Sequence, residues 1–233
     1  MIRKNKMTSY EHKVKNIYLW EPWWSPWPNT YAYYPLTENA NDTSGNNRNL
    51  TADSSITYST ENGAFFPHSA HHGLLEPFNI STNDTWTISF WGNSLGNWYE
   101  WSDWKFVDLA ETTNTWKRIA ISWYNNKTTM MLNFSTGSYP SVQKTCSSNT
   151  RHHYTITIWE SRATKFYMDW VVALTWTSNS YTTTNFRWGQ ERNEWFVRQL
   201  NWYIKDIIIE TKTRTDQEIA DYFDQTKTNY GIS

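Results

Sequence analysis

The chain has 233 residues, a formal net charge of −1, 18% charged residues and one cysteine. Its length fits one large all-β domain, or a domain of about 200 residues with a tail, and its charge gives no electrostatic reason to expect nucleic acid or an anionic membrane as a partner. Cys146 has no second cysteine for an intrachain disulfide or a cysteine-based zinc site. No apolar run reaches the roughly 18 residues of a membrane span, so we expect no membrane insertion. We find no recognisable signal peptide.

The first 29 residues show no consistent period and run into LWEPWWSPWPNT, which contains three prolines. Prolines at this density interrupt regular structure. We therefore expect residues 1–29 to be a poorly ordered leader and linker, and residues 30–233 to form one domain.

From Tyr31 onward, short segments of β-branched and aromatic residues alternate with clusters of Asn, Asp, Ser and Gly. This pattern predicts strands joined by turns. The expected strands are residues 30–36, 55–59, 64–66, 85–91, 105–110, 118–124, 128–135, 153–159, 164–169, 171–176 and 203–210. So many strands without intervening helices favour a sandwich or jelly roll over a parallel α/β fold.

Two of these segments, TWTISFW (85–91) and HYTITIW (153–159), place large apolar side chains at every second position. Period-2 alternation of this kind is typical of a sheet with one buried face and one wet face. The residues expected to face the core are Trp86, Ile88, Phe90, Tyr154, Ile156 and Ile158.

One helix is expected near the C-terminus, in RTDQEIADYF (214–223). Thr215 is a suitable N-cap, and Glu218 three residues later completes a capping box. An apolar face that repeats at helical spacing should pack on the sandwich. That face consists of Ile219, Tyr222 and Phe223.

Five stretches occur in one order: AYYPLTENANDTSGNNRNLT (32–51), TWTISFW (85–91), RHHYTITIWESRATKFYMDWVVALTW (151–176), FRWGQE (186–191) and NWYIKDIIIETKTRTDQEIADYF (201–223). Together they resemble the laminin-G-like, concanavalin A-like jelly-roll domains of bacterial surface proteins and phage virion proteins, over roughly residues 30 to 230. The resemblance implies an all-β, concanavalin A-like jelly-roll β-sandwich of two antiparallel sheets with one short C-terminal helix.

The chain departs from this family where its members usually have glycine. In KFYMDWVVAL (165–174) the two-residue turn is Asp169-Trp170, although a tight hairpin turn needs positive φ at both positions, where a bulky side chain is strained. Asn201-Trp202 likewise stands where the family has Asn-Gly. Glycine is also scarce, with 8 residues against the roughly 16 that average usage would give.

A misread codon would explain these departures together, because some bacterial lineages read UGA as glycine while a common alternative code reads it as tryptophan. We hypothesise that nine tryptophans are biologically glycines: Trp20, Trp23, Trp24, Trp27, Trp116, Trp170, Trp176, Trp195 and Trp202. The same question is open for Trp98, Trp101 and Trp104, whereas Trp86, Trp91 and Trp123 fit strand faces.

The densest aromatic stretch, NWYEWSDWKF (97–106), is a candidate sugar-binding surface, because carbohydrate C–H faces pack on aromatic rings. Its candidate ligand-binding residues are Tyr99, Glu100, Trp101 and Asp103. The competing interpretation is that these aromatics are partly structural and partly misread glycines.

Calcium is the one cofactor the sequence suggests, and no motif requires a cofactor. The turn NANDTSGNN (39–47) brings together the oxygen donors of Asn41, Asp42 and Asn46, and some jelly-roll lectins hold Ca²⁺ in such loops. Turns rich in Asn and Asp also form without metal, because their side chains bond to nearby backbone.

Five of the six histidines fall in HSAHHG (68–73) and RHH (151–153). A metal site would need three or four of their ring nitrogens to converge, but His152 and His153 should point to opposite faces of a strand. Glycoside hydrolysis needs two carboxylates, and the compact Glu-x-Asp-x-x-Glu motif of β-glucanases is absent, since EWSDWK ends in Lys105. We therefore expect no enzyme activity.

We expect a non-catalytic binding or adhesion module of an extracellular, cell-surface or virion protein, which presents loops at the sandwich rim to a glycan or a surface protein. The alternative is a structural or interaction domain, such as a decoration or appendage part, that binds no sugar. A glycoside hydrolase is the third reading. Fold does not decide among them.

Overall fold

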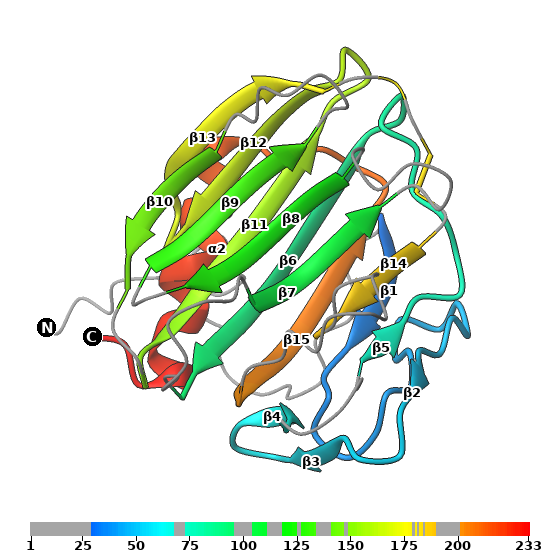
Figure 1. Cartoon of the computed structure of the whole chain (residues 1–233), viewed down its shortest axis with the longest axis vertical. Helices are drawn as coiled ribbons and strands as arrows, with labels where there is room; N and C mark the ends of the chain where they lie inside the picture. The colour runs from blue at the N-terminus through cyan, green and yellow to red at the C-terminus, as the bar shows by residue number, and fades with distance from the viewer. Residues whose placement is uncertain are drawn as a thin grey trace, which may run out of the picture.

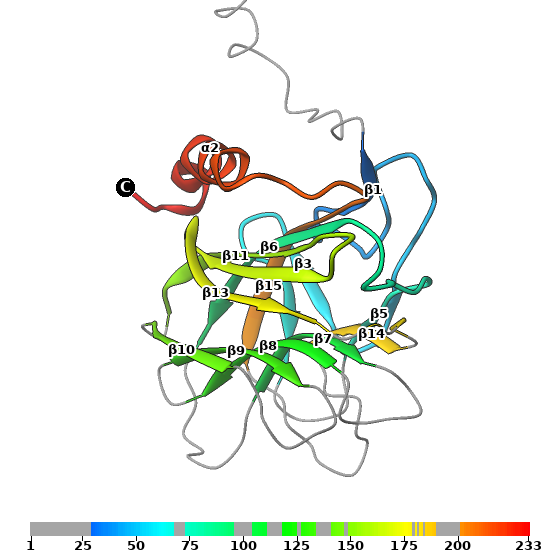
Figure 2. The same cartoon turned by 90° about the horizontal axis from the view of Figure 1, so that it is seen from above.

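The computed structural model describes residues 29–67, 73–95, 104–110, 118–124, 127–133, 141–146, 149–178, 180, 182–183, 185–189 and 201–233. In this part of the chain two β-sheets lie face to face, and one α-helix covers the outer face of one of them (Figure 1, Figure 2). Most of the expected leader lies outside the described residues, so the domain boundary at residue 30 stays a prediction.

Sheet A has eight strands in the antiparallel order β13-β12-β11-β6-β15-β4-β3, with β1 also paired to β15. Its strands are β1 (Thr30–Tyr34), β3 (Thr57–Ser59), β4 (Gly63–Phe66), β6 (Trp86–Ser94), β11 (Arg151–Ile158), β12 (Ala163–Met168), β13 (Val171–Thr177) and β15 (Trp202–Glu210). A bulge in β15 lets its first half pair with β4 and its second half with β1.

Sheet B has seven strands in the antiparallel order β10-β9-β8-β7-β14-β5-β2. They are β2 (Thr51–Ala52), β5 (Leu74–Leu75), β7 (Trp104–Ala110), β8 (Arg118–Tyr124), β9 (Lys127–Asn133), β10 (Ser141–Thr145) and β14 (Asn185–Trp188). Four of the observed strands, β2, β5, β10 and β14, lie outside the segments expected from the sequence.

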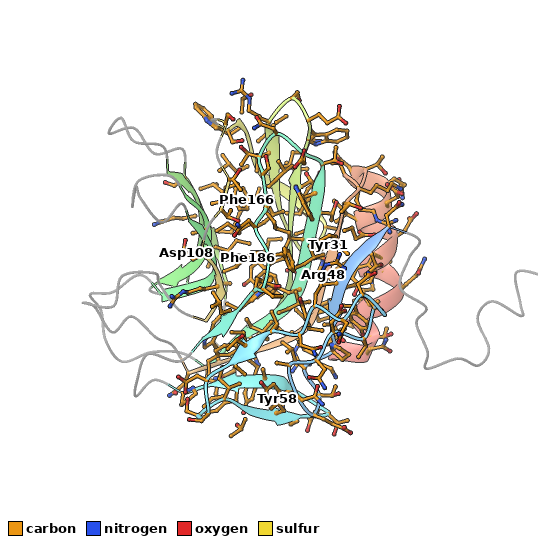
Figure 3. All side chains as sticks on the ribbon, turned by 90° about the vertical axis from the view of Figure 1, so that its right-hand side faces the viewer. Tyr31, Arg48, Tyr58, Asp108, Phe166 and Phe186 are labelled. Carbon is orange, nitrogen blue, oxygen red and sulfur yellow. The ribbon has the colours of Figure 1, made fainter. Side chains whose placement is uncertain are left out.

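The hydrophobic core fills the space between the two sheets. All six residues expected to face it from residues 85–91 and 153–159 are buried there, which confirms the predicted alternation. Phe166 of β12 and Phe186 of β14 lie in this layer from opposite sheets (Figure 3). The prediction of an all-β sandwich of two antiparallel sheets with one short C-terminal helix is confirmed.

The helix α2 (Asp216–Thr226) has the predicted capping box. The side-chain hydroxyl of Thr215 accepts from the Glu218 N–H (3.2 Å), and the Glu218 carboxylate accepts from the Thr215 N–H (2.8 Å). The helix runs three residues past the expected end and continues as the 3₁₀ helix η1 (Lys227–Tyr230).

The apolar face of α2 packs on the outer face of sheet A, as Figure 2 shows. Phe223 stacks on Trp91 of β6 with 5.8 Å between ring centroids, and Tyr222 lies 5.2 Å from the ring of His153 on β11. Trp91 thus packs against the helix, whereas Trp86 packs in the core between the sheets. Both are buried, in line with the interpretation that they are authentic.

The hairpin between β12 and β13 has the two-residue turn that the sequence predicts. Met168 pairs with Val171, and Asp169 and Trp170 between them have φ of 49° and 66°. Positive φ at both positions is the type I′ requirement. Trp170 therefore occupies a backbone conformation that suits glycine.

The other described positions of the glycine hypothesis differ from Trp170. Trp202 is fully buried in β15, with 4.9 Å between its ring centroid and that of Phe66, and Trp176 is 47% exposed in β13. Neither has a positive φ. Of these three tryptophans, Trp170 is the one whose backbone conformation favours glycine. The other six positions, and Trp98 and Trp101, lie outside the described residues.

Candidate binding site

The aromatic stretch expected to bind sugar, with Tyr99, Glu100, Trp101 and Asp103, lies outside the described residues. Its role stays a prediction. The described residues present two other surfaces at opposite edges of the sandwich: a pocket beside β2, β5 and β14, and an exposed strand, β13 (Figure 1).

The calcium candidate Asp42 lies in a loop held by hydrogen bonds to its carboxylate. One oxygen accepts from the N–H groups of Tyr33 (3.0 Å) and Ser44 (2.8 Å), and the other accepts from the N–H of Arg48 (2.9 Å). Burial alone would raise the pKa of Asp42, but these backbone hydrogen bonds outweigh it and lower the pKa below its usual value. Asp42 is thus an ionised organiser of the loop.

The structure brings Asn41 and Asn46 into the same loop. The side-chain amide of Asn46 donates to the carbonyl oxygens of Thr30 and Tyr31, each at 3.1 Å, so its donor side faces the protein. Calcium takes six to eight oxygen ligands, whereas this loop offers the single carboxylate of Asp42, already engaged by three N–H groups. Among the described residues no group of three or more His, Cys, Asp or Glu could hold a metal. Calcium binding stays a prediction.

Arg48 ties this loop to β1. Its guanidinium lies 3.6 Å from the ring centroid of Tyr31 and donates to the Tyr31 carbonyl oxygen at 3.0 Å (Figure 3). Because the cation sits over the ring face, the loop and the strand are held together by charge and by hydrogen bonds.

The two neighbouring histidines of β11 face opposite sides, as expected. His152 Nδ1 lies 2.6 Å from a carboxylate oxygen of Asp169, whose other oxygen accepts from the His153 N–H at 2.9 Å. The His153 ring is buried beneath α2, where burial lowers its pKa to about 3. The tract at residues 68–72 lies outside the described residues.

Beneath α2 a small polar cavity of about 10 Å³ is lined by His153, Thr155, Glu210 and Arg214, among others. Neither ring nitrogen of His153 has a hydrogen-bond partner, while Arg214 forms two bonds to Glu210 at 2.8 and 2.5 Å. The volume suits about one water molecule. This cavity is therefore too small for a sugar or another organic ligand.

The larger hollow is a pocket of about 220 Å³ at the sheet B edge. We call it the edge pocket, and its residues include Thr51, Asp53, Gly73, Leu74, Leu75 and Arg187. It lies beside β2 and β5, which have only two residues each, and beside β14.

The edge pocket combines opposite charges with an apolar wall. Asp53 is held in the turn after β2, where its carboxylate accepts from the Ser55 N–H (3.2 Å) and hydroxyl (3.1 Å). Arg187 belongs to β14, paired with Leu75 on one side and Asp108 on the other. Leu75 is 39% exposed. The pocket can therefore offer a polar ligand both donors and acceptors beside a hydrocarbon surface.

Glu76 follows the edge pocket in sequence but points into the core. Its carboxyl group accepts from Trp188 Nε1 (2.6 Å) and lies 2.9 Å from the Tyr34 hydroxyl, which donates to the Arg48 carbonyl oxygen at 2.7 Å. Burial raises the pKa of Glu76 to about 8, and the hydrogen bonds with Trp188 and Tyr34 lower it by less than burial raises it. A neutral Glu76 can donate to the Tyr34 hydroxyl, which in turn donates to the Arg48 carbonyl oxygen, so that all three groups have hydrogen-bond partners.

The opposite edge of the sandwich is apolar. Around β13 the exposed fractions are 50% for Trp170, 47% for Val171, 37% for Val172 and 47% for Trp176. We call these four residues the apolar edge. Sequence reasoning identified the hairpin but did not foresee this surface, because side-chain exposure at a sheet edge depends on which strand comes last.

No protein-family model matches the chain, and no curated protein matches it either. In the described residues no helix is long and apolar enough to cross a membrane.

Solved structures do match. The binding domain of botulinum neurotoxin serotype D aligns with a TM-score of 0.67 and 16% identity, covering 84% of this chain and 52% of that chain. The binding domain of Paraclostridial Mosquitocidal Protein 1 has a TM-score of 0.67, 14% identity, and coverages of 84% and 52%.

The binding domain of botulinum neurotoxin DC, solved in complex with rat synaptotagmin II, has a TM-score of 0.64 and 14% identity, covering 84% of this chain and 51% of that chain. The chain spans about half the length of these domains. At such low identity the likeness shows the fold: this chain shares the β-sandwich found in toxin binding domains.

Proposed function

We propose that the chain is a non-catalytic binding module of the laminin-G-like type, part of an extracellular, cell-surface or virion protein, and that it holds a glycan unit in the edge pocket. The observation that carries this proposal is the pocket itself, which places Asp53, Arg187 and Thr51 around a volume of about 220 Å³.

Sugar chemistry suits this set of side chains. Each sugar hydroxyl both donates and accepts, so a carboxylate and a guanidinium that line the same pocket can bind neighbouring hydroxyls. The exposed Leu75 can pack against the C–H groups of a sugar ring. The volume fits a single ring better than a larger ligand, because drug-sized ligands occupy pockets of roughly 300 Å³ or more.

A hydrolytic role lacks support at this pocket. Glycoside hydrolysis needs two carboxyl groups across the scissile bond, and among the described lining residues Asp53 is the one carboxylate. The nearby carboxyl of Glu76 is buried in the core. The names of the similar structures support a binding role as well, although only about half of each domain is covered.

The second candidate is an interaction domain that binds other chains and no sugar. The apolar edge favours it, because exposed apolar patches mark surfaces that contact other proteins. A glycan array separates the two candidates, because the second candidate binds no sugar.

A glycan array probed with the purified chain tests the first role. We expect a bound glycan class, and we expect Arg187→Ala and Asp53→Ala each to weaken binding at least about tenfold, or ~1.4 kcal/mol. Gln143→Ala, at an exposed position of β10 at the other end of sheet B, is the control and should bind normally. A wild-type chain that binds no glycan, or variants that bind as well as wild type, would overturn the proposal.

We also propose that Trp170 and the other eight tryptophans of the hypothesis are glycines in the source organism. The positive φ of Trp170 supports this at one position. Peptide masses from the natural protein, or TGA rather than TGG codons, would establish it. TGG at position 170 would end the idea.

A further inference from the structure

Strand β13 forms one end of sheet A. It pairs with β12 along its whole length, and no strand of the described part of the chain pairs with its other side. An edge strand carries a row of N–H and C=O groups that can pair with another chain. Figure 1 shows β13 at the rim of the sandwich, above β10.

The other described sheet edges have features that discourage pairing with another chain. β2 and β3 have two and three residues, and β10 carries the charged Lys144. The outer side of β1 is covered by the loop of Asp42, where the Thr43 N–H donates to the Tyr33 carbonyl oxygen at 2.8 Å. Short length, charge and cover all discourage pairing between edges.

β13 lacks two of these devices, since its seven residues, VVALTWT, make it long and include no charged side chain. A register shift opposite Phe166 and Tyr167 is its one irregularity. Val172 pairs with Tyr167 on the outer face, and Val171 pairs with Met168 on the core face. Both faces of the strand therefore offer apolar side chains to a partner.

We propose that β13 is the pairing edge of a symmetric dimer, in which β13 of a second copy adds antiparallel to it and joins the two sheets. The strand suits a copy of itself, because antiparallel self-pairing centred on Leu174 places uncharged residues opposite uncharged residues throughout. A charged partner strand would bury its charges without counter-ions. The net charge of −1 gives two copies little reason to repel each other.

The dimer does not depend on whether Trp170 and Trp176 are tryptophan or glycine. The backbone edge and the two valines are the same in both cases. The dimer is also independent of glycan binding, because the edge pocket lies at the opposite edge of the sandwich.

Sedimentation equilibrium of the full chain over a range of concentrations tests the proposal. We expect a mass that rises with concentration to that of two chains. Val172→Lys should lower dimer affinity at least tenfold, because a lysine on an edge strand blocks strand addition. Leu75→Lys is the matched control, since Leu75 is 39% exposed and Val172 37% exposed. It should dimerise normally.

Hydrogen exchange locates the contact. Amides of β13 should exchange more slowly at high concentration, while those of β10 should not change. The proposal is overturned if the wild-type chain stays monomeric at its highest soluble concentration. A dimer without slower exchange in β13, or a folded Val172→Lys chain that dimerises as tightly as wild type, would overturn it too.

Discussion

The two edges of the sandwich differ in the length and charge of their strands. At the edge pocket the strands β2 and β5 shrink to two residues each, and the loops around them leave a hollow with opposite charges. At the other edge β13 keeps seven uncharged residues. The first shape suits a small polar ligand and the second suits another strand. One fold can therefore offer two kinds of binding surface, set by strand length and charge at its edges.

The largest effect on folding stability should come from the buried carboxyl group of Glu76, which follows Leu75 of the edge pocket in sequence. Its folded pKa of about 8 exceeds the ordinary 4.5, so the folded chain keeps a proton that the unfolded chain releases. Wild-type stability should therefore fall as pH rises from about 4.5 to about 8, by an amount on the order of 3–5 kcal/mol.

Glu76→Gln should remove most of this fall, because a neutral amide can keep the contacts with Trp188 and Tyr34. Urea unfolding of wild type and Glu76→Gln from pH 4 to pH 9 measures how the free energy of unfolding of each chain changes with pH. Equal pH dependence in both would show that Glu76 is ionised in the folded chain.

Asp42→Ala should have the next largest effect on folding stability. It leaves three backbone N–H groups without their acceptor and should cost about 2–3 kcal/mol at neutral pH. Since the folded pKa of Asp42 is lowered, the stability it gives wild type is lost on acidification below the unfolded pKa. Thermal unfolding should show a larger difference in stability between the two chains at pH 7 than at pH 3.

The same two chains test the calcium prediction. A rise in Tm with calcium in wild type but not in Asp42→Ala would place the ion in this loop. No rise in wild type would leave Asp42 with its role in holding the loop alone.

At the apolar edge, Trp170→Gly should stabilise the chain by about 1–3 kcal/mol, because it relieves a bulky residue at positive φ. Trp176→Gly is its control: Trp176 is about as exposed but has no positive φ, so glycine there should give no such gain in stability. A lowered or unchanged Tm in Trp170→Gly would contradict the tight-turn strain.

The smallest effects on folding should come from the exposed positions Val172 and Leu75. Lysine at either should change the free energy of unfolding by no more than about 0.5 kcal/mol. Chemical denaturation of both variants measures it. A loss of several kcal/mol in either would mean that its edge is part of the folding core and not a free surface.

The sequence predicted the features that depend on neighbouring residues. The alternation around Ile88 and Ile156, the capping box of Thr215 and Glu218, and the turn at Asp169 all follow from local spacing. It missed features that depend on distant partners. Two-residue strands such as β5 have no pattern of their own, and they exist because β14 supplies their hydrogen bonds.

The edge pocket escaped prediction for the same reason. Asp53 and Arg187 are far apart in sequence, and only the pairing of β2 with β5 and of β5 with β14 brings them together. The burial of Glu76 was equally invisible, since its partner Trp188 comes from another strand. The sequence around Glu76 does not show that a distant indole N–H will donate a hydrogen bond to its buried carboxyl group.

Locating a glycan on the folded chain tests the role of the edge pocket most directly. Backbone amide NMR shifts of the labelled chain should be followed during titration with the glycan that binds most tightly on the array. We predict shifts at Leu74, Leu75 and Arg187, with none at Val172. Shifts that gather around β13, or that avoid the edge pocket altogether, would contradict the account.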